Sequence, residues 1–278
     1  MSFEAFYSPL IQPPLPWFSL VLAVFTAWLM GFSRSGLGAG GFVVSPLMVL
    51  ALGASDGLAV IAVIMIPAGC LGCWQHRKNV DRKLLTPLIP AAFVGTALGA
   101  LILWALIASG EEAAVHERME YVVAGLSLLY VALVSFRDKI AKLGGGGGPT
   151  TSKGVFAVGS LLALSQTVAN SGSPLITVYF VRHGLEKKQF VAAQNFFLLI
   201  QNTIKLIPFL ALGVLHIGNA GAALILFPIT MLGSWNGKQF NRVSTDKSFF
   251  TLYIVLLVLG FFSSVILLWG RSDFLALF

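Results

Sequence analysis

Long apolar segments separated by short polar loops are the feature that most restricts what this chain can fold into. The 278 residues are 57% apolar and only 10% charged, which leaves too few charges to cover a water-soluble core. The segments lack the alternating pattern of an outer-membrane barrel, so helices are expected to cross the lipid. The sequence therefore predicts an all-α, multi-pass protein of the cell membrane. The apolar segments run roughly over residues 17–31, 42–53, 57–75, 86–108, 120–136, 154–168, 174–181, 189–209, 217–236 and 249–269.

Two stretches rich in glycine and serine interrupt the apolar sequence, one in each half of the chain. The first is GFSRSGLGAGGFVVSP, Gly31 to Pro46, and the second is LALSQTVANSGSPLI, Leu162 to Ile176. At 1.5 Å per residue, the apolar arms measure about 21 and 17 Å around the first break and about 21 and 12 Å around the second. None of these four arms is long enough to cross a hydrocarbon core of about 30 Å. Each pair is therefore either one interrupted span or a re-entrant hairpin that enters and leaves on the same side.

The distribution of Lys and Arg distinguishes between these two arrangements. If both breaks are interrupted spans, the loop cations divide about nine to seven between the two sides of the membrane, which is no bias. If both are hairpins, Arg118 and Arg271 are the cations outside, and all the other loop cations lie inside. Because cytoplasmic loops are enriched in Lys and Arg, hairpins are favoured, with six full spans and the amino terminus outside. The inside cations are then Arg77, Lys78, Arg82, Lys83, Arg137, Lys139, Lys142, Lys153, Arg182, Lys187, Lys188, Lys238, Arg242 and Lys247.

Three spans follow each hairpin, and this odd number turns the second copy upside down relative to the first. Two inverted repeats are the architecture of many secondary carriers. The predicted organisation is an extracytoplasmic segment at residues 1–16, a first transmembrane repeat at 17–136, a glycine-rich cytoplasmic linker at 137–153 and a second transmembrane repeat at 154–278. The acidic Glu4 stands where a signal peptide carries positive charge, so no cleavable signal is expected.

The two breaks are the predicted substrate site. A helix that begins inside the membrane has unpaired N–H groups and a partial positive charge at its N-terminus, which together attract an anion. Glycines let a ligand approach the backbone closely, and serine, asparagine and glutamine side chains add hydrogen-bond donors. The predicted site residues are Ser33, Arg34, Ser35, Gly38, Gly40 and Gly41 at the first break, and Gln166, Asn170, Ser171, Gly172 and Ser173 at the second.

Arg34 is the strongest of these candidates. An isolated arginine in the middle of a bilayer costs at least about 3 kcal/mol, so such a charge indicates function. Two structural interpretations remain open. Arg34 can instead be a buried cation paired with backbone carbonyls, and the small residues can simply allow helices to pack closely.

The predicted span at 189–209 carries a polar stripe. Gln194, Gln201 and Lys205 fall on one helical face, with Asn195 and Asn202 beside them. Asn195, Gln201 and Lys205 are therefore added to the predicted substrate site. An alternative for Lys205 is that it lies about 24 Å from the inner end of its helix and snorkels to the outer surface.

No cofactor or metal site is expected. Cys70 and Cys73 form a C-x-x-C pattern inside an apolar segment, where packing is the simpler interpretation and a redox role stays open. The four histidines have no ligand spacing. The net charge of +7 comes from loops between membrane segments, so lipid and not nucleic acid is the expected partner. A nucleophile and base for an enzyme are not found, so transport is favoured over catalysis.

At the two breaks the sequence resembles the sulfite exporter TauE/SafE family, also called the toluenesulfonate uptake permease family. The matching stretches are GLGAGGFVVSPLMVLALG and SGSPLITVYFVRHGL. The resemblance implies a carrier that exports small sulfur-containing anions such as sulfite or short organosulfonates. An uptake permease for an organic sulfonate, or a structural subunit of a membrane complex, are the alternatives, and a homo-oligomer is compatible with each. The family's motif falls on Gly36, Gly38, Gly40, Gly41 and Pro46, and on Gly172 and Pro174.

The carboxylates bear on what drives transport. All eleven Asp and Glu residues lie at segment ends or in loops, so the sequence offers no buried acid as a proton relay. The hypothesis is that an anion leaves down its electrochemical gradient, with the inside-negative potential contributing about 2.3 kcal/mol per charge per 100 mV. Titration of a histidine or protonation of the substrate remains a second route, one that couples protons.

Overall fold

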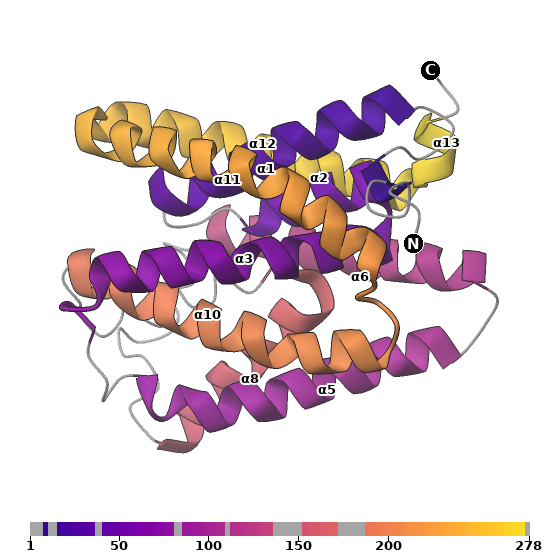
Figure 1. The fold of residues 1–278 in the computed structure, drawn as a ribbon, viewed down its shortest axis with the longest axis horizontal. Coiled ribbons are helices and arrows are strands. Elements are labelled where there is room, and N and C mark those ends of the chain that lie inside the picture. The colour runs from indigo at the N-terminus through magenta and orange to yellow at the C-terminus, as the bar shows by residue number, and fades with distance from the viewer. Residues whose placement is uncertain are drawn as a thin grey trace.

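The computed structural model describes residues 8–10, 16–36, 41–80, 85–108, 112–135, 152–171 and 187–275. Every regular element within these residues is a helix, so the all-α prediction is confirmed for them (Figure 1). Two helices are short, η2 (Ser8–Leu10) and α13 (Arg271–Leu275). The others are α1 (Pro16–Gly36), α2 (Gly41–Leu52), α3 (Ala54–His76), α5 (Leu88–Ala108), α6 (Glu112–Ser135), α8 (Ser152–Ala169), α10 (Lys187–Ala211), α11 (Ile217–Val243) and α12 (Asp246–Trp269).

Five helices in the described part of the chain are long and apolar enough to cross a membrane. They are α1, α3, α5, α11 and α12, and the last four are spans that the sequence predicts. The two remaining predicted spans are the helices α6 and α10. With 24 and 25 residues these two are long enough to cross, but they are not among the five helices that meet the criteria of both length and composition.

The first arm, α1, is longer than the sequence predicts. The helix continues through Arg34 to Gly36, and its 21 residues extend about 31 Å, so the prediction of an arm too short to cross is wrong. The reason is helix packing. A Cβ at Gly31 would collide with the backbone of Thr230 on α11, and one at Gly36 would lie 3.1 Å from the carbonyl oxygen of Gly237. These glycines let two helix backbones touch without interrupting α1.

The other three predicted arms agree with the structure to different degrees. α2 has 12 residues and extends only about 18 Å, as expected for a half-length arm. The residue that follows it, Gly53, has a φ of 81°, in the left-handed region that favours glycine. α8 has 18 residues, about 27 Å, and is longer than the predicted segment 154–168. The predicted second arm at 174–181 and residues 137–151 of the linker predicted at 137–153 lie outside the described residues, whereas Ser152 and Lys153 of that linker begin α8.

Contacts in three helix pairs show whether the packed helices run parallel or antiparallel. α1 and α11 run parallel, since Gly31 lies against Thr230 while Gly36 lies against Gly237 and accepts a hydrogen bond from Asn241. α5 and α8 also run parallel: Gly95 lies against Ser160 and Ala163, and Gly99 against Leu164 and Thr167. α3 and α10 run antiparallel, with Gly69 against Leu199 and Gly72 against Asn195 (Figure 1).

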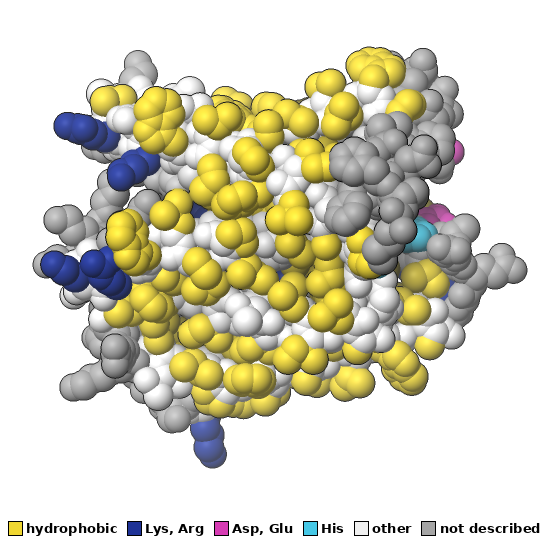
Figure 2. Space-filling view, in the orientation of Figure 1, with side chains coloured by type: hydrophobic (Ala, Val, Ile, Leu, Met, Phe, Trp, Pro, Cys, Tyr) yellow, Lys and Arg dark blue, Asp and Glu magenta, His cyan; other side chains and the backbone are white. Residues whose placement is uncertain are grey.

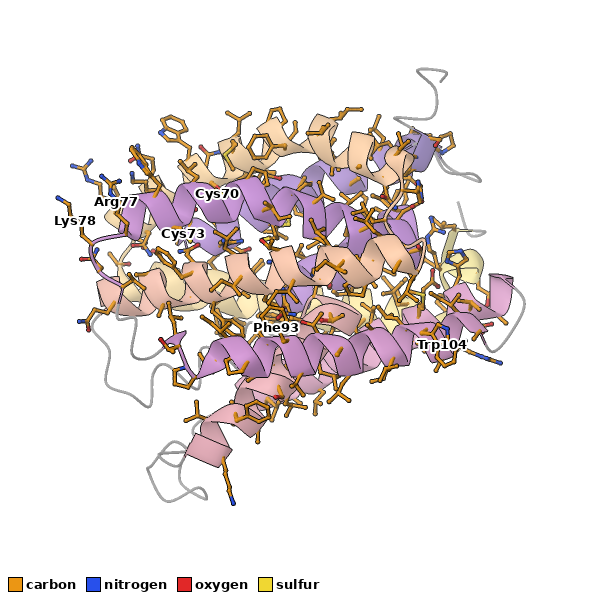
Figure 3. All side chains as sticks on the ribbon, turned by 60° about the horizontal axis from the view of Figure 1, so that its bottom comes forward. Cys70, Cys73, Arg77, Lys78, Phe93 and Trp104 are labelled. Atoms are coloured by element: carbon orange, nitrogen blue, oxygen red, sulfur yellow. The ribbon has the colours of Figure 1, made fainter. Side chains whose placement is uncertain are left out.

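Charged side chains lie at the two ends of the molecule. Figure 2 shows Lys and Arg at one end, His and acidic side chains at the other, and an apolar surface between them. Figure 3 places Arg77 and Lys78 just beyond the end of α3, and Trp104 of α5 toward the opposite end. The described surface therefore has the charge asymmetry that the loops predict, and it matches a multi-pass membrane protein.

Arg271 connects α13 to the end of α2. Its guanidinium donates to the carbonyl oxygens of Leu50 and Ala51, at 2.9 and 3.3 Å, so it binds acceptors that the helix end leaves free. Burial lowers the pKa of Arg271 from its ordinary value, and the nearby Glu120 and Asp56 act in the opposite direction. The short arm is therefore held at its C-terminal end by a cation. Glu120 of α6 is itself buried, so the expectation that the chain has no buried acid is wrong for this residue.

Candidate functional site

Arg34 lies in the last turn of α1 and joins three helices. Its Nε and Nη2 donate to Oδ1 of Asn195 on α10, at 3.2 and 3.1 Å, and its Nη1 contacts the sulfur of Met65 on α3. The side chain is half-buried. The proposed pairing of Arg34 with backbone carbonyls is not what the structure shows, because its described acceptors are a side-chain amide and a thioether. Arg34 and Asn195, both predicted site residues, are therefore brought together.

Glycines on α3 make room for this contact. A Cβ at Gly72 would lie 2.6 Å from Oδ1 of Asn195, and one at Gly69 would lie 3.5 Å from Nη2 of Arg34. The two glycines are three residues apart and so face the same way on the helix. Asn195 therefore lies directly against the α3 backbone, in the position where its amide oxygen meets the guanidinium.

Lys205 lies at the end of α8, where the second break begins. The side chain has 0% exposure, and its Nζ donates to Oδ1 of Asn170 and, at 3.3 Å, to the carbonyl oxygen of Gln166. Its amine also lies over the ring of Phe209, 5.6 Å from the centroid. The alternative that Lys205 snorkels to the surface is wrong, because its side chain is fully buried. The sequence does not reveal which helices surround it.

Asn170 holds the break in place. Its φ of 50° is in the left-handed region, which asparagine tolerates better than most residues, and its backbone N–H closes the last turn on Gln166. Its Nδ2 donates to the carbonyl oxygen of Leu58 on α3, at 3.2 Å. With Nδ2 committed to α3, Oδ1 faces Lys205. One side chain thus links α3, α8 and α10.

The two breaks are in direct contact where the structure describes them. The hydroxyl of Ser45, on α2, donates to the carbonyl oxygen of Ala169, at the end of α8. Ser171 donates to the same carbonyl at 2.9 Å and lies 3.2 Å from the hydroxyl of Ser127 on α6. Residues that are 124 positions apart in the chain therefore meet, and Ser45 of the first break lies at the end of α8, where the second break begins.

Other predicted residues of α10 have different roles. Gln201 is fully buried and its amide bonds to Thr96 on α5 and to Thr167 and the carbonyl oxygen of Ala163 on α8, which indicates that it joins helices. Asn202 is also fully buried, and its Nδ2 donates to the carbonyl oxygen of Leu198 at 2.7 Å. Its Oδ1 has no hydrogen-bond partner among the described residues.

The remaining predicted site residues either lie away from these contacts or fall outside the described residues. Ser33 is buried and bonds back to the carbonyl oxygen of Met30, and Ser35 is exposed, so neither contributes to the contacts above. Gly41 is the first residue of α2. The other glycines and the serine of the two breaks lie outside the described residues, namely Gly38, Gly40, Gly172 and Ser173. Sequence reasoning missed Met65, Phe209 and the carbonyl of Leu58, since nothing in the sequence distinguishes them from packing residues.

The two cations share a property that the sequence does not show. Within the described ranges, neither Arg34 nor Lys205 is paired with a carboxylate. Asn195, the partner of Arg34, and Lys205 lie ten positions apart along α10, which corresponds to about 15 Å along that helix. The bundle therefore contains two separate cationic side chains, the half-buried Arg34 and the fully buried Lys205.

The sulfur ligands of α3 form no described metal site. Cys73 is buried and Cys70 is exposed, and both lie on α3 before Arg77 (Figure 3). Within the described residues, no group of three His, Cys, Asp or Glu side chains is placed to hold a metal ion.

Comparison with known families decides the class of protein. The family model described as sulfite exporter TauE/SafE matches residues 22–264, which is most of the chain and includes both breaks. The chain belongs to this family. No curated protein and no solved structure gives a match. TauE/SafE proteins are multi-pass membrane transporters and not enzymes, in agreement with the five apolar helices long enough to span.

Proposed function

We propose that this TauE/SafE protein exports small sulfur-containing anions, such as sulfite or short organosulfonates, through a site between the two helix breaks near the bilayer midplane. The observation that carries this proposal is the pair of cations inside the helix bundle, the half-buried Arg34 and the fully buried Lys205, each held by the amide oxygen of an asparagine. The family relationship supports a sulfur anion as the substrate.

The physical argument is one of charge compensation. Removing a cation from water is expensive unless an opposite charge accompanies it, and a neutral amide oxygen compensates only part of that cost. An anion that enters between α1, α3, α8 and α10 would supply the missing charge. Membrane proteins keep such residues inside the bilayer where they interact with a substrate or an ion.

The spacing of the cations suggests two positions for the anion. The separation of about 15 Å between Asn195 and Lys205 along α10 is larger than one sulfite ion can bridge. Arg34 lies beside Met65 and Gly69, in the half of α3 that ends at the cationic Arg77, whereas Asn170 binds Leu58 near the other end of α3. We assign Arg34 to the cytoplasmic half of the path and Lys205 to the outer half.

The helix pairs support an inverted repeat. The first helix of each half packs in parallel along a helix of the other half, α1 along α11 and α8 along α5, and the antiparallel pair α3 and α10 lies between them. Exchanging the two halves converts each of these contacts into another contact of the same kind. In this arrangement each half contributes one hairpin, and the break of each hairpin lies toward the centre of the bundle. In the first hairpin the arm α1 is long enough to cross the membrane.

Flux into liposomes tests the proposal. Protein reconstituted in liposomes is given sulfite, sulfate, thiosulfate and methanesulfonate on one side, and the wild type is compared with Arg34→Ala and Asn170→Ala. We expect flux of at least one sulfur anion, reduced in both variants, and stabilisation of the detergent-solubilised wild type by the same anion. If both variants transport and are stabilised like the wild type, the site is elsewhere. If the wild type moves none of the four anions, the assigned substrate class is wrong.

A further inference from the structure

The ammonium of Lys205 has a partner for each of its three N–H groups. Its Nζ donates to Oδ1 of Asn170 and, at 3.3 Å, to the carbonyl oxygen of Gln166, and it lies 5.6 Å from the ring centroid of Phe209. The face of an aromatic ring attracts a cation, and an ammonium has three donors and no acceptor. The side chain is fully buried. The surroundings of Nζ therefore form a complete shell for one small monovalent cation.

This shell lies at the C-terminal end of α8, which is the negative pole of that helix. The last four carbonyl groups of a helix have no partner within it, and the helix end carries about half a negative charge. Gln166 supplies one of these carbonyls to Lys205, and the carbonyl of Ala169 accepts hydrogen bonds from Ser45 and Ser171. These groups are neutral oxygens, so the single charge of one monovalent cation complements the pole.

The end of α2 shows the same kind of contact with a different cation. Arg271 donates to the carbonyl oxygens of Leu50 and Ala51, at 2.9 and 3.3 Å. α2 and α8 are both arms next to a break, and each has a cationic side chain from another helix on its last carbonyls. The two cations differ in exposure, because Arg271 is partly exposed whereas Lys205 is enclosed. A cation at the end of an arm is therefore a repeated element of this fold.

Secondary carriers built on broken helices coordinate Na⁺ or a proton with carbonyl groups at such helix ends. We propose that the C-terminal end of α8 is a monovalent-cation site that the ammonium of Lys205 fills as a tethered ion. Because Lys205 uses the acceptors and repels a second cation, neither Na⁺ nor K⁺ binds there. The tethered ammonium also joins α10 to α8 at the second break without a free ion.

The consequence for the driving force of transport rests on the proposed function. A cation that belongs to the chain is not exchanged with the solution, so gradients of Na⁺ and K⁺ do no work through this site. The anion then moves without a Na⁺ or K⁺ ion bound beside it at the second break. Export of the anion down its own electrochemical gradient is compatible with such a site.

Lys205→Ala tests the site, because it removes the tethered ammonium and leaves its acceptors in place. Methylammonium offers the same three N–H groups, whereas tetramethylammonium has the same charge and no N–H group. Lys205→Met keeps the volume of the side-chain stem and leaves no room for either ion. Lys238→Ala, at an exposed position on α11, is the matched control. The thermal midpoint of each detergent-solubilised protein is measured while methylammonium chloride replaces tetramethylammonium chloride at constant ionic strength.

We expect Lys205→Ala to have a lower midpoint than the wild type in tetramethylammonium chloride. The midpoint should recover by about 3–6 °C once methylammonium reaches about ten times its Kd. The wild type, Lys205→Met and Lys238→Ala should not respond to the exchange of salts. If Lys205→Ala is as stable as the wild type in tetramethylammonium chloride, or if methylammonium stabilises none of the proteins or all of them equally, the proposal is wrong.

The wild type decides the question if Lys205→Ala does not fold. Anion flux into liposomes is measured near zero potential, with Na⁺ and K⁺ either imposed as gradients or replaced by N-methylglucamine. We expect these exchanges to change the flux less than about twofold. Flux that requires Na⁺ or K⁺, or that follows their gradients, overturns the proposal.

The same comparison separates this proposal from the proposed function. If the wild type moves none of the four anions, the proposed function fails, and the thermal midpoint in Na⁺, K⁺ and N-methylglucamine salts still decides about the cation site. Equal midpoints in the three salts support a site filled by Lys205. A midpoint that Na⁺ or K⁺ raises specifically contradicts it.

Discussion

Replacing Gly72 by alanine should disconnect Asn195 from Arg34. The added Cβ would lie 2.6 Å from Oδ1 of Asn195 and 2.9 Å from its Cγ, so the amide has to move by about 0.8 Å to reach an ordinary contact of about 3.4 Å. The hydrogen bonds from Arg34 are already 3.1 and 3.2 Å long. A shift of this size takes the oxygen out of hydrogen-bond range of the guanidinium.

The size of the effect follows from the two interactions that change. Hydrogen bonds to a charged group contribute about 1.5–3 kcal/mol to stability. Alanine stabilises a helix interior by about 1 kcal/mol relative to glycine, which offsets part of their loss. Gly72→Ala should therefore lower the free energy of unfolding by about 0.5–2 kcal/mol. The released Arg34 should weaken sulfite binding about 5- to 30-fold. The assays are thermal unfolding in detergent and sulfite-dependent stabilisation.

Gly125→Ala on α6 is the matched control, since a Cβ there meets nothing within 4 Å. It should leave binding unchanged and stability equal or slightly higher. In an Asn195→Ala background, Gly72→Ala should have no further cost, because the colliding amide is gone. If Gly72→Ala and Gly125→Ala behave alike in both assays, Asn195 does not position Arg34 as described.

Three further variants test other parts of the structure. Arg34→Gln should lower sulfite flux at least about tenfold, whereas Arg77→Gln, exposed beyond the end of α3, should change it less than about twofold; equal effects would contradict a specific role. Gly233→Ala presses a methyl group into the carbonyl of Trp28 on α1 and should cost about 1–3 kcal/mol, seen as a lower thermal midpoint in detergent; an unchanged midpoint would contradict the close packing of α1 on α11. Arg271→Gln removes the donors to the last carbonyls of α2 and should cost about 1–3 kcal/mol. Because burial lowers the pKa of this guanidinium and yet an arginine stays charged near neutrality, that cost should be the same from about pH 6 to 8; a cost that changes over this range would contradict a permanently charged Arg271.

Much of the helical framework can be predicted from the apolar pattern. α2 is found at Gly41–Leu52 where the sequence predicts 42–53, and four of the six predicted spans meet the length and composition of membrane helices. The pattern works because lipid admits only long apolar segments that satisfy their own backbone. It fails at the end of α1, where a Gly- and Ser-containing sequence remains helical because α11 covers it.

The candidate site could be predicted only in part. Arg34 and Lys205 are recognisable because charge inside an apolar segment is rare. Their connection through Asn195 and Asn170 depends on which helices are neighbours, and helical periodicity gives a face but not the partner of that face. For this reason the sequence left open whether Lys205 contributes to the site or snorkels, and the structure shows that it is buried.

An anion-bound structure tests the central claim most directly. Crystals grown with selenite, a heavier analogue of sulfite, give an anomalous signal that locates the anion without reference to the protein. We expect a peak between α1, α3, α8 and α10, within hydrogen-bond distance of Arg34 or of the Nζ of Lys205. Peaks confined to the exposed cations at the ends of α3 and α11, with none beside these two side chains, would contradict the account.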